Sequence, residues 1–262
     1  DNERIAWKTA RLLGIDHVEY RVGKVNGARV SACDEMLSDT EELIPAGQIM
    51  RIFRKGGYRE RRDIWVDACQ RLGVDRETIM HATDDFLFLD FLLRNTDRHY
   101  NNFGLIRDVE SFTIRPAPIY DSGASLWNGM DPDAMDNGDY RTKPFWTDQW
   151  GEEDNAYWQL SLIDDWDRYD LGVLDDVPDI VHEQLSTNQR LSPMLIDRIT
   201  GLLRGRLPII RHQRNTTAAR HMIGMTPIHG LDNPSTGQGL QLPDPADVPD
   251  DARPDDPGIG LV

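Results

Sequence analysis

Cysteine is nearly absent from this chain of 262 residues, which contains only Cys33 and Cys69. Two cysteines cannot form the disulfide network that stabilises many small secreted proteins, and they suit a reducing compartment. The chain also lacks an apolar run of about 18 residues and has no charged segment followed by an apolar one at its start. We therefore expect a cytoplasmic protein with no membrane span, no membrane partner and no secretion signal.

The seven histidines lack the spacing of a zinc site. His212, His221 and His229 are nine and eight residues apart, which does not place two ligands on one face of a helix. His182 has acidic neighbours but no second histidine nearby. The histidines therefore predict no zinc centre.

Acidic residues dominate, with a net charge of −16, and they are concentrated in two blocks. Residues 131–176 contain fourteen Asp or Glu against three Lys or Arg, and residues 226–262 contain seven against one. The first block also holds four tryptophans, Trp146, Trp150, Trp158 and Trp166. It either binds a basic substrate segment by charge complementarity or forms a solvated face over an aromatic core. The second block has seven prolines and few large apolar residues, which predicts a disordered or surface-bound tail.

Basic residues cluster between positions 51 and 62. The members are Arg51, Arg54, Lys55, Arg59, Arg61 and Arg62. Such a cluster is compatible with nucleic-acid binding, but in an acidic chain it is more typical of a solvated helix face. We expect nucleic acid to be at most an indirect partner.

The most informative stretch is NTDRHYNNF at residues 95–103, followed by IYDSG at residues 119–123. A hydroxyl nucleophile needs a proton acceptor, and Mg²⁺ bound to ATP phosphates needs hard oxygen ligands. An Asp, an Asn five positions later and a second Asp after the next hairpin supply these groups. Asp97, Asn102 and Asp121 fit the three roles in that order. Asp and Asn are also ordinary loop residues, so the flanking sequence has to support this interpretation.

The flanking residues predict a rigid support for these groups. Residues 83–94 begin with TDD and continue with the apolar run FLFLDFLL, which predicts a buried helix ending at Arg94. Residues 103–106 and 112–120 predict the two strands of a hairpin, after which Asp121 emerges beside the loop. Further helices are expected at residues 61–72, 76–82, 178–185 and 193–207.

Together these segments resemble the catalytic and metal-binding segments of the HipA-like serine/threonine kinases, the toxin kinases of bacterial toxin–antitoxin pairs. The likeness is carried by Asn-x-Asp-Arg-His-x-x-Asn-Phe and Pro-x-Tyr-Asp-x-x-x-Ser. Phosphoinositide kinases share a similar Asp-Arg-His-x-x-Asn core. The resemblance implies that Asp97 is the catalytic base, that Asn102 and Asp121 bind Mg²⁺, and that ATP is the second cofactor. Arg98 and His99 would support the loop. It also implies a protein substrate with a Ser or Thr acceptor and an antitoxin as a further partner.

The resemblance continues upstream in a looser form. Residues 1–14 (DNERIAWKTARLLG) predict a short amphipathic helix with an Asx start and a terminal glycine. It is similar to a small-lobe helix of these kinases, whose Asn-Glu start places a Glu near the nucleotide phosphates. Glu3 is therefore expected to pair with an ATP-binding lysine. The alternative is a solvated first-turn Glu that the helix dipole favours.

Two strands and a hinge are expected after this helix. Residues 17–22 and 28–33 alternate like strands around a loop. By the same resemblance, Asp34, Glu35 and Met36 would form the hinge that binds adenine through its backbone.

Two parts of a kinase nucleotide site are missing from the sequence, a Gly-rich loop above the phosphates and a lysine on a strand. Lys8 lies in a helical pattern, and Gly56-Gly57 lacks the three-glycine spacing of a phosphate loop. We expect both parts on a segment that precedes Asp1. The alternative is a degenerate kinase.

The sequence thus predicts an α+β protein of the protein-kinase-like class, with a mostly helical large lobe, a catalytic β-hairpin and a partial small lobe. The expected divisions are residues 1–40 for the partial small lobe and hinge, 41–225 for the helical catalytic lobe and 226–262 for the tail. The sequence KPF at residues 143–145 is similar to a segment that follows the metal-binding Asp in this family. The expected activity is ATP- and Mg²⁺-dependent phosphotransfer by a serine/threonine protein kinase. The alternatives are an inactive kinase-like regulator or scaffold, and a nucleic-acid-linked regulator.

Overall fold

The structure is a computed structural model that describes residues 1–53, 61–138, 140–145 and 155–222. The described residues form one compact unit. Three sequence expectations concern parts outside the described residues: the acidic tail, half of the basic cluster (Arg54, Lys55 and Arg59), and Trp146 and Trp150.

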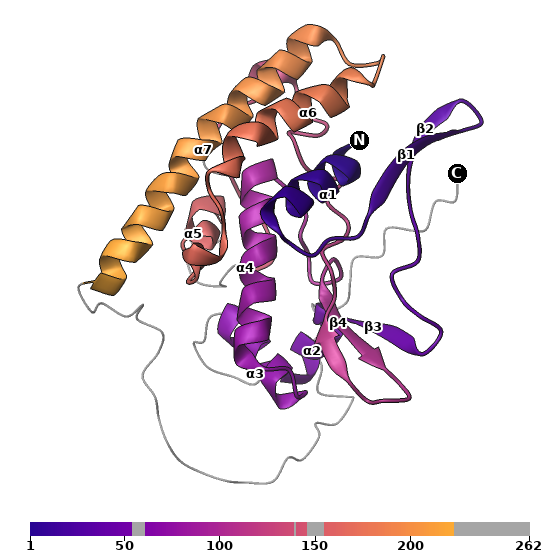
Figure 1. Cartoon of the computed structure of the whole chain (residues 1–262), viewed down its shortest axis with the longest axis vertical. Helices are drawn as coiled ribbons and strands as arrows, with labels where there is room; N and C mark the ends of the chain where they lie inside the picture. Colours follow the sequence, from indigo (N-terminus) through magenta and orange to yellow (C-terminus); the bar gives the residue numbers. More distant parts are fainter. Residues whose placement is uncertain (54–60, 139, 146–154, 223–262) are drawn as a thin grey trace. The chain divides into compact units, whose positions relative to one another are not determined.

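Helix α4 (Arg76–Leu93) is the central element of this unit, with α6 and α7 on one side and the strands on the other (Figure 1). The side chain of Asp75 caps its start by accepting a hydrogen bond from the Thr78 N–H at 3.0 Å. Its last residues form an unbroken buried stretch before Arg94 ends the helix in the left-handed conformation. The predicted end is confirmed. The predicted start at Thr83 is wrong, because the two helices expected at 76–82 and 83–94 form one continuous helix.

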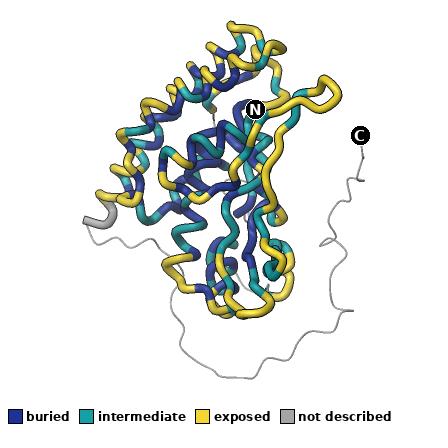
Figure 2. The backbone as a smooth tube through the Cα atoms, turned by 45° about the vertical axis from the view of Figure 1, so that its right-hand side comes forward, coloured by how far each residue is buried: buried dark blue, intermediate teal, exposed yellow. Residues whose placement is uncertain are grey.

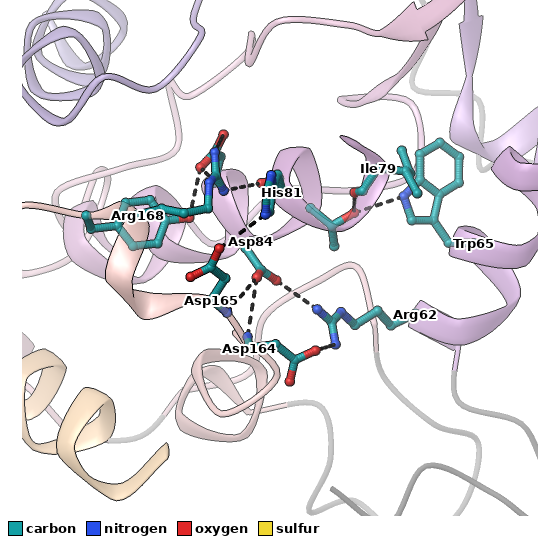
Figure 3. A network of polar contacts seen from close by, with 11 residues as sticks. Arg62, Trp65, Ile79, His81, Asp84, Asp164, Asp165 and Arg168 are labelled. Carbon is teal, nitrogen blue, oxygen red and sulfur yellow. Dashed lines mark hydrogen bonds and ion pairs between the residues drawn. The ribbon is translucent and has the colours of Figure 1, made fainter. Parts of the chain in front are cut away.

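A buried ion pair explains how α4 continues through its acidic residues (Figure 3). Arg62 of α3 (Arg61–Arg71) donates to Asp84 Oδ1 at 2.8 Å and to Asp164 Oδ2 at 3.3 Å. The other Asp84 oxygen faces the backbone N–H groups of Asp164 and Asp165 at 3.3 and 3.5 Å. Burial raises the pKa of Asp84 to about 6, and the Arg62 charge opposes this shift. Arg62, expected on a solvated face, is therefore a core residue that joins α3, α4 and a downstream loop.

The main sheet has three antiparallel strands in the order β3-β4-β5. The expected hairpin is present as β4 (Gly104–Asp108) and β5 (Ile114–Pro116). Strand β3 (Glu41–Pro45), which the sequence analysis did not predict, pairs with β4. The two backbones approach so closely that a Cβ at Gly104 would overlap the Ile44 carbonyl. Only glycine at this position permits the pairing.

A separate, mostly exposed hairpin consists of β1 (Tyr20–Val25) and β2 (Ala28–Cys33) (Figure 2). Its turn is Asn26-Gly27, with φ values of 50° and 78°. Positive φ at both positions is the conformation that an Asn-Gly pair favours in two-residue hairpins. The first strand was expected at residues 17–22 but lies at residues 20–25, and the loop between the two strands is shorter than expected. His17 instead bridges to Ile119 beside the end of the main sheet.

Helices α1, α3, α5 and α7 contact α4, whereas α2 packs on α3 and α6 packs on α7, and the buried residues form one core (Figure 2). The N-terminal helix α1 contacts α4 and α6 and ends at Gly14, which has a φ of 71°. Among the described residues, no helix is both long enough and apolar enough to cross a bilayer. The helices are α1 (Asn2–Leu13), α2 (Ala46–Phe53), α5 (Ala156–Leu160), α6 (Val177–Ser186) and α7 (Pro193–Met222), with short 3-10 turns at Pro132–Ala134, Trp166–Arg168 and Val173–Asp176.

Candidate active site

The loop that carries Asp97 is attached to the end of α4. Asn95 donates from Nδ2 to Asp90 Oδ1 at 2.9 Å, and its backbone N–H donates to the Asp90 carbonyl at 2.8 Å. The Asn95 side-chain oxygen in turn accepts from the Asp97 N–H at 3.2 Å. The loop therefore begins at a fixed position relative to the buried helix.

Arg98 links the three segments of the site. Its guanidinium is fully buried and forms a two-pronged contact with Asp90, at 2.8 and 2.9 Å. It also donates to the carbonyl oxygens of Asn102, at 2.9 Å, and Tyr120, and to Ser122 Oγ at 3.1 Å. The planar guanidinium has five N–H donors, so it can hold all these groups at once. One side chain thus joins the loop to the segment that carries Asp121.

Asp97 and Asn102 lie at the two ends of this loop. The Asn102 Nδ2 donates to the Asp97 carbonyl at 3.0 Å, and the Asn102 backbone N–H donates to the His99 carbonyl at 2.8 Å. This contact orients the buried amide of Asn102 so that its Oδ1 points away from the Asp97 carbonyl. The Asp97 side chain is 48% exposed and can meet a substrate. The His99 ring accepts from the Asn101 N–H of the same loop at 3.3 Å.

Asp121 is exposed and has a φ of 54°, a conformation that Asp tolerates better than most residues. The residues after it are held by the start of α1. Glu3 accepts from the Ser122 N–H at 2.9 Å, and Asn2 donates to the carbonyls of Gly123 and Ser125 at 2.9 and 2.7 Å. Burial raises the pKa of Glu3, and the Ser122 hydrogen bond opposes this shift. Glu3 therefore lies beside the Asp121 segment and is partly buried there. It is not the solvated first-turn residue that was the alternative.

The expected hinge residues lie at the end of the exposed hairpin. Asp34 forms an ion pair with Arg21 of β1, and both Asp34 and Glu35 are exposed, whereas Met36 is half-buried. No ligand contact defines their role, and adenine binding by this segment stays a prediction.

The metal prediction depends on one amide and one carboxylate. The described residues contain no group of three His, Cys, Asp or Glu side chains that could hold an ion without other ligands. Mg²⁺ is commonly bound by one or two protein ligands together with substrate phosphates and water. The orientation of Asn102 and the exposure of Asp121 fit that kind of site.

Comparisons with known proteins identify the fold. No family model matches the chain. The serine/threonine-protein kinase CtkA of Helicobacter pylori is 24% identical over 134 residues, which is 50% of this chain and 41% of CtkA. The crystal structure of the proinflammatory kinase CtkA from H. pylori superimposes with a TM-score of 0.61 at 19% identity, covering 83% of this chain and 87% of that one. The chain has a kinase-like fold.

This kinase-like chain is also similar to HipA in the toxin–antitoxin complex of Shewanella oneidensis with HipB and operator DNA. That match has a TM-score of 0.47 at 12% identity and covers 82% of this chain and 57% of HipA, so it adds no argument. The resemblance to HipA-like serine/threonine kinases and the α+β kinase-like class predicted from the sequence are confirmed. The sequence match spans less than half of CtkA, so activity, substrate and partners are proposals here.

Three further residues that contact the kinase-like site were not predicted from the sequence. His17 donates from Nδ1 to the Val18 carbonyl at 2.8 Å, so its Nε2 is the acceptor for Ser122 Oγ at 3.2 Å. Lys143 Nζ contacts Asp97 Oδ1 at 2.9 Å. His17 and Ser122 carry no local signal, because their contact joins distant segments. Lys143 lies in the KPF sequence that resembled a family segment, and this was the signal available for it.

Proposed function

We propose that the chain is the catalytic part of an ATP- and Mg²⁺-dependent phosphotransferase of the serine/threonine protein kinase type. The observation that carries this proposal is the set of contacts made by Arg98, which bring Asp97, Asn102 and Asp121 onto one connected support. A kinase needs a proton acceptor and metal ligands in one place, and these three residues supply both. The similarity to CtkA supports the same reaction class.

Each residue has a distinct role in the proposal. Asp97 accepts the proton of the substrate hydroxyl and orients its oxygen toward the phosphorus. Asn102 Oδ1 and the Asp121 carboxylate would hold Mg²⁺. When bound, ATP would supply the phosphoryl group and Mg²⁺ would offset the negative charge of its phosphates. Arg98 and His99 support the loop, and Glu3 fixes the backbone after Asp121.

The proposed substrate is a protein with a Ser or Thr acceptor, and the proposed place of action is the cytoplasm. An antitoxin is a further proposed partner. A direct role in nucleic-acid binding has less support, because Arg62 of the expected basic cluster is buried against Asp84. An inactive kinase-like regulator is the alternative, and the next experiment distinguishes it.

Substitutions at Asp97 and Asp121 separate the base from the metal ligand. In the protein encoded by the full gene, Asp97→Asn should leave the Mg²⁺-ATP affinity nearly unchanged while single-turnover phosphorylation falls about 10²–10⁴-fold, the usual contribution of general-base assistance. Asp121→Asn should weaken both, because Asp121 would be a ligand of the Mg²⁺ that binds together with ATP. Asp179→Asn, which changes an exposed Asp paired with Arg204, is the matched control and should change neither.

Thermal melting provides the binding measurement, since a ligand that binds the native state raises the melting temperature. If Mg²⁺-ATP does not change the melting temperature of the full-length protein, the nucleotide site is wrongly assigned. If Mg²⁺-ATP binds but no transfer occurs in the parent protein, the inactive-regulator alternative is correct.

A further inference from the structure

Lys143 contributes a positive charge next to the proposed catalytic base. Its Nζ lies 2.9 Å from Asp97 Oδ1, although the two residues are 46 positions apart. It is one of only four lysines in the sequence, with Lys8, Lys24 and Lys55. Its side chain is 41% exposed, so it can reach a ligand as well as Asp97.

The backbone that carries Lys143 is held in place on both sides. Before it, the Thr142 hydroxyl lies 3.3 Å from the carbonyl oxygens of both Asn95 and Lys143 and can donate to either, and the Thr142 carbonyl accepts from the buried side chain of Gln159 at 3.0 Å. After it, Phe145 is fully buried and packs against the rings of Phe86 and Phe103, with centroids 5.9 and 6.1 Å apart. The Thr142 contact attaches the segment to the first residues of the catalytic loop. The Lys143 position is therefore built together with that loop.

Stability does not explain this arrangement. An ion pair between two half-exposed side chains typically contributes about 0–1 kcal/mol, because solvent screens the charges. The Asp97 oxygen that Lys143 does not contact remains the acceptor for a substrate hydroxyl. The contact thus brings a carboxylate and a cation together from segments 46 residues apart.

We propose that Lys143 is a catalytic residue whose ammonium group contacts the transferred phosphoryl group while it orients Asp97. The inference rests on the proposed phosphotransferase function. Lysine is a compact cation with three rotatable donors, so it can contact Asp97 and a phosphoryl oxygen together. In a near-attack geometry the reacting oxygen and phosphorus are about 3–3.5 Å apart, which brings the phosphoryl oxygens within reach of a cation already bound to the base.

The proposed step balances as follows. The substrate hydroxyl oxygen forms a bond to the γ-phosphorus, and its proton passes to Asp97. The bond between the γ-phosphorus and the bridging oxygen breaks, and its electron pair leaves with ADP. Lys143 remains protonated throughout and stabilises the charge on the γ-phosphoryl oxygens in the transition state.

The test compares Lys143→Met and Lys143→Arg in the full-length protein, with Lys8→Met as the matched control. Lys8 is also paired with a carboxylate, that of Glu183 on α6, at 3.8 Å, and this pair lies outside the site loop. Dephosphorylated casein serves as acceptor. We expect Lys143→Met to lower kcat about 10²–10³-fold, the effect of removing one transition-state donor, while KM for Mg²⁺-ATP stays within about threefold. Lys143→Arg should recover part of kcat, and Lys8→Met should match the parent.

A second measurement needs no acceptor protein. Aluminium fluoride added to Mg²⁺-ADP mimics the transferred phosphoryl group, and the parent should melt at a higher temperature with both than with Mg²⁺-ADP alone. Lys143→Met should lose this additional increase and keep the increase caused by Mg²⁺-ADP.

Three results would overturn the proposal. Parent-like kcat and a retained fluoride effect in Lys143→Met, with transfer lost in Asp97→Asn, would remove Lys143 from the mechanism but leave the proposed function intact. A lower melting temperature of unliganded Lys143→Met than of Lys8→Met, with unchanged kcat, would show a structural role. Absence of any Mg²⁺-ADP effect in the parent would reject the proposed function itself.

Discussion

His17 has an unusual environment for a histidine, because every polar atom of its ring is used in a buried chain of hydrogen bonds. Arg98 donates to Ser122, and Ser122 donates to His17, which donates to the Val18 carbonyl. Burial lowers the pKa of His17 to about 4, and the Val18 hydrogen bond opposes this shift. Protonation would remove the acceptor for Ser122 and place a second positive charge near Arg98.

This environment predicts a specific pH dependence of stability. The folded-state pKa of His17 lies below the unfolded value of about 6.5, so the contribution to stability is present above pH 6.5 and is lost as pH falls through 4. The shift corresponds to about 3 kcal/mol. Urea unfolding at several pH values should show the parent losing stability over this range relative to His17→Asn, which does not titrate.

The matched control is His182→Asn, since His182 is half-exposed and pairs with Asp197 at 3.5 Å on the outer helices. It should not reproduce the difference. Equal pH dependence in the parent and His17→Asn would mean that His17 is not held neutral by burial.

Among the elements, α3, α4 and the loop after α5 depend on the Arg62 contacts (Figure 3). Removing one partner of a buried ion pair leaves the other charge unpaired, which typically costs about 3–5 kcal/mol. Arg62→Met should therefore lower the free energy of unfolding by about that amount in urea denaturation.

The control for this prediction is Arg204→Met, because Arg204 and Asp179 form an exposed pair at 3.0 Å. Loss of an exposed pair should change stability by less than about 1 kcal/mol. A similar small effect for Arg62→Met would show that the Arg62 pair contributes no more than a surface contact.

The elements that the sequence predicted are those with local signals. The end of α4 and the β4–β5 hairpin follow from an apolar run and alternation. Strand β3 was missed because its residues are all half-buried and show no alternation. The Asn26-Gly27 pair is a local signal for a two-residue turn. Because the turn lies there, β1 runs to Val25 and does not end at residue 22 as expected.

In the site, too, the sequence predicted the residues that belong to a local motif. Asp97, Asn102 and Asp121 form a recognisable spacing, and their roles stay predictions. The contacts of Glu3, His17 and Lys143 with the site span 46 to 119 residues, so the sequence indicated Glu3 and the Lys143 segment only through their resemblance to a kinase family and gave no signal for His17.

For the whole molecule, nearly all buried apolar residues of the described chain form one cluster between Ile5 and Ile210. A chain ending at Thr226 therefore keeps all of this core. Its free energy of unfolding should differ from that of the complete chain by less than about 1 kcal/mol, measured by urea denaturation. A larger loss would mean that residues 227–262 contribute apolar contacts, with Ile228, Leu231, Leu240 and Leu242 as the first residues to substitute.

The contacts of Ser122 have a consequence for the order in which the site opens and closes. Its hydroxyl is joined to Arg98 across 24 residues, whereas its backbone N–H is joined to Glu3 across 119 residues. Closing the longer loop costs more chain entropy, so the contact with α1 should form late and open first. Hydrogen exchange at the Ser122 amide should then be faster than at the core of α4, and it would report the release of α1 while the loop around Asp97 stays folded.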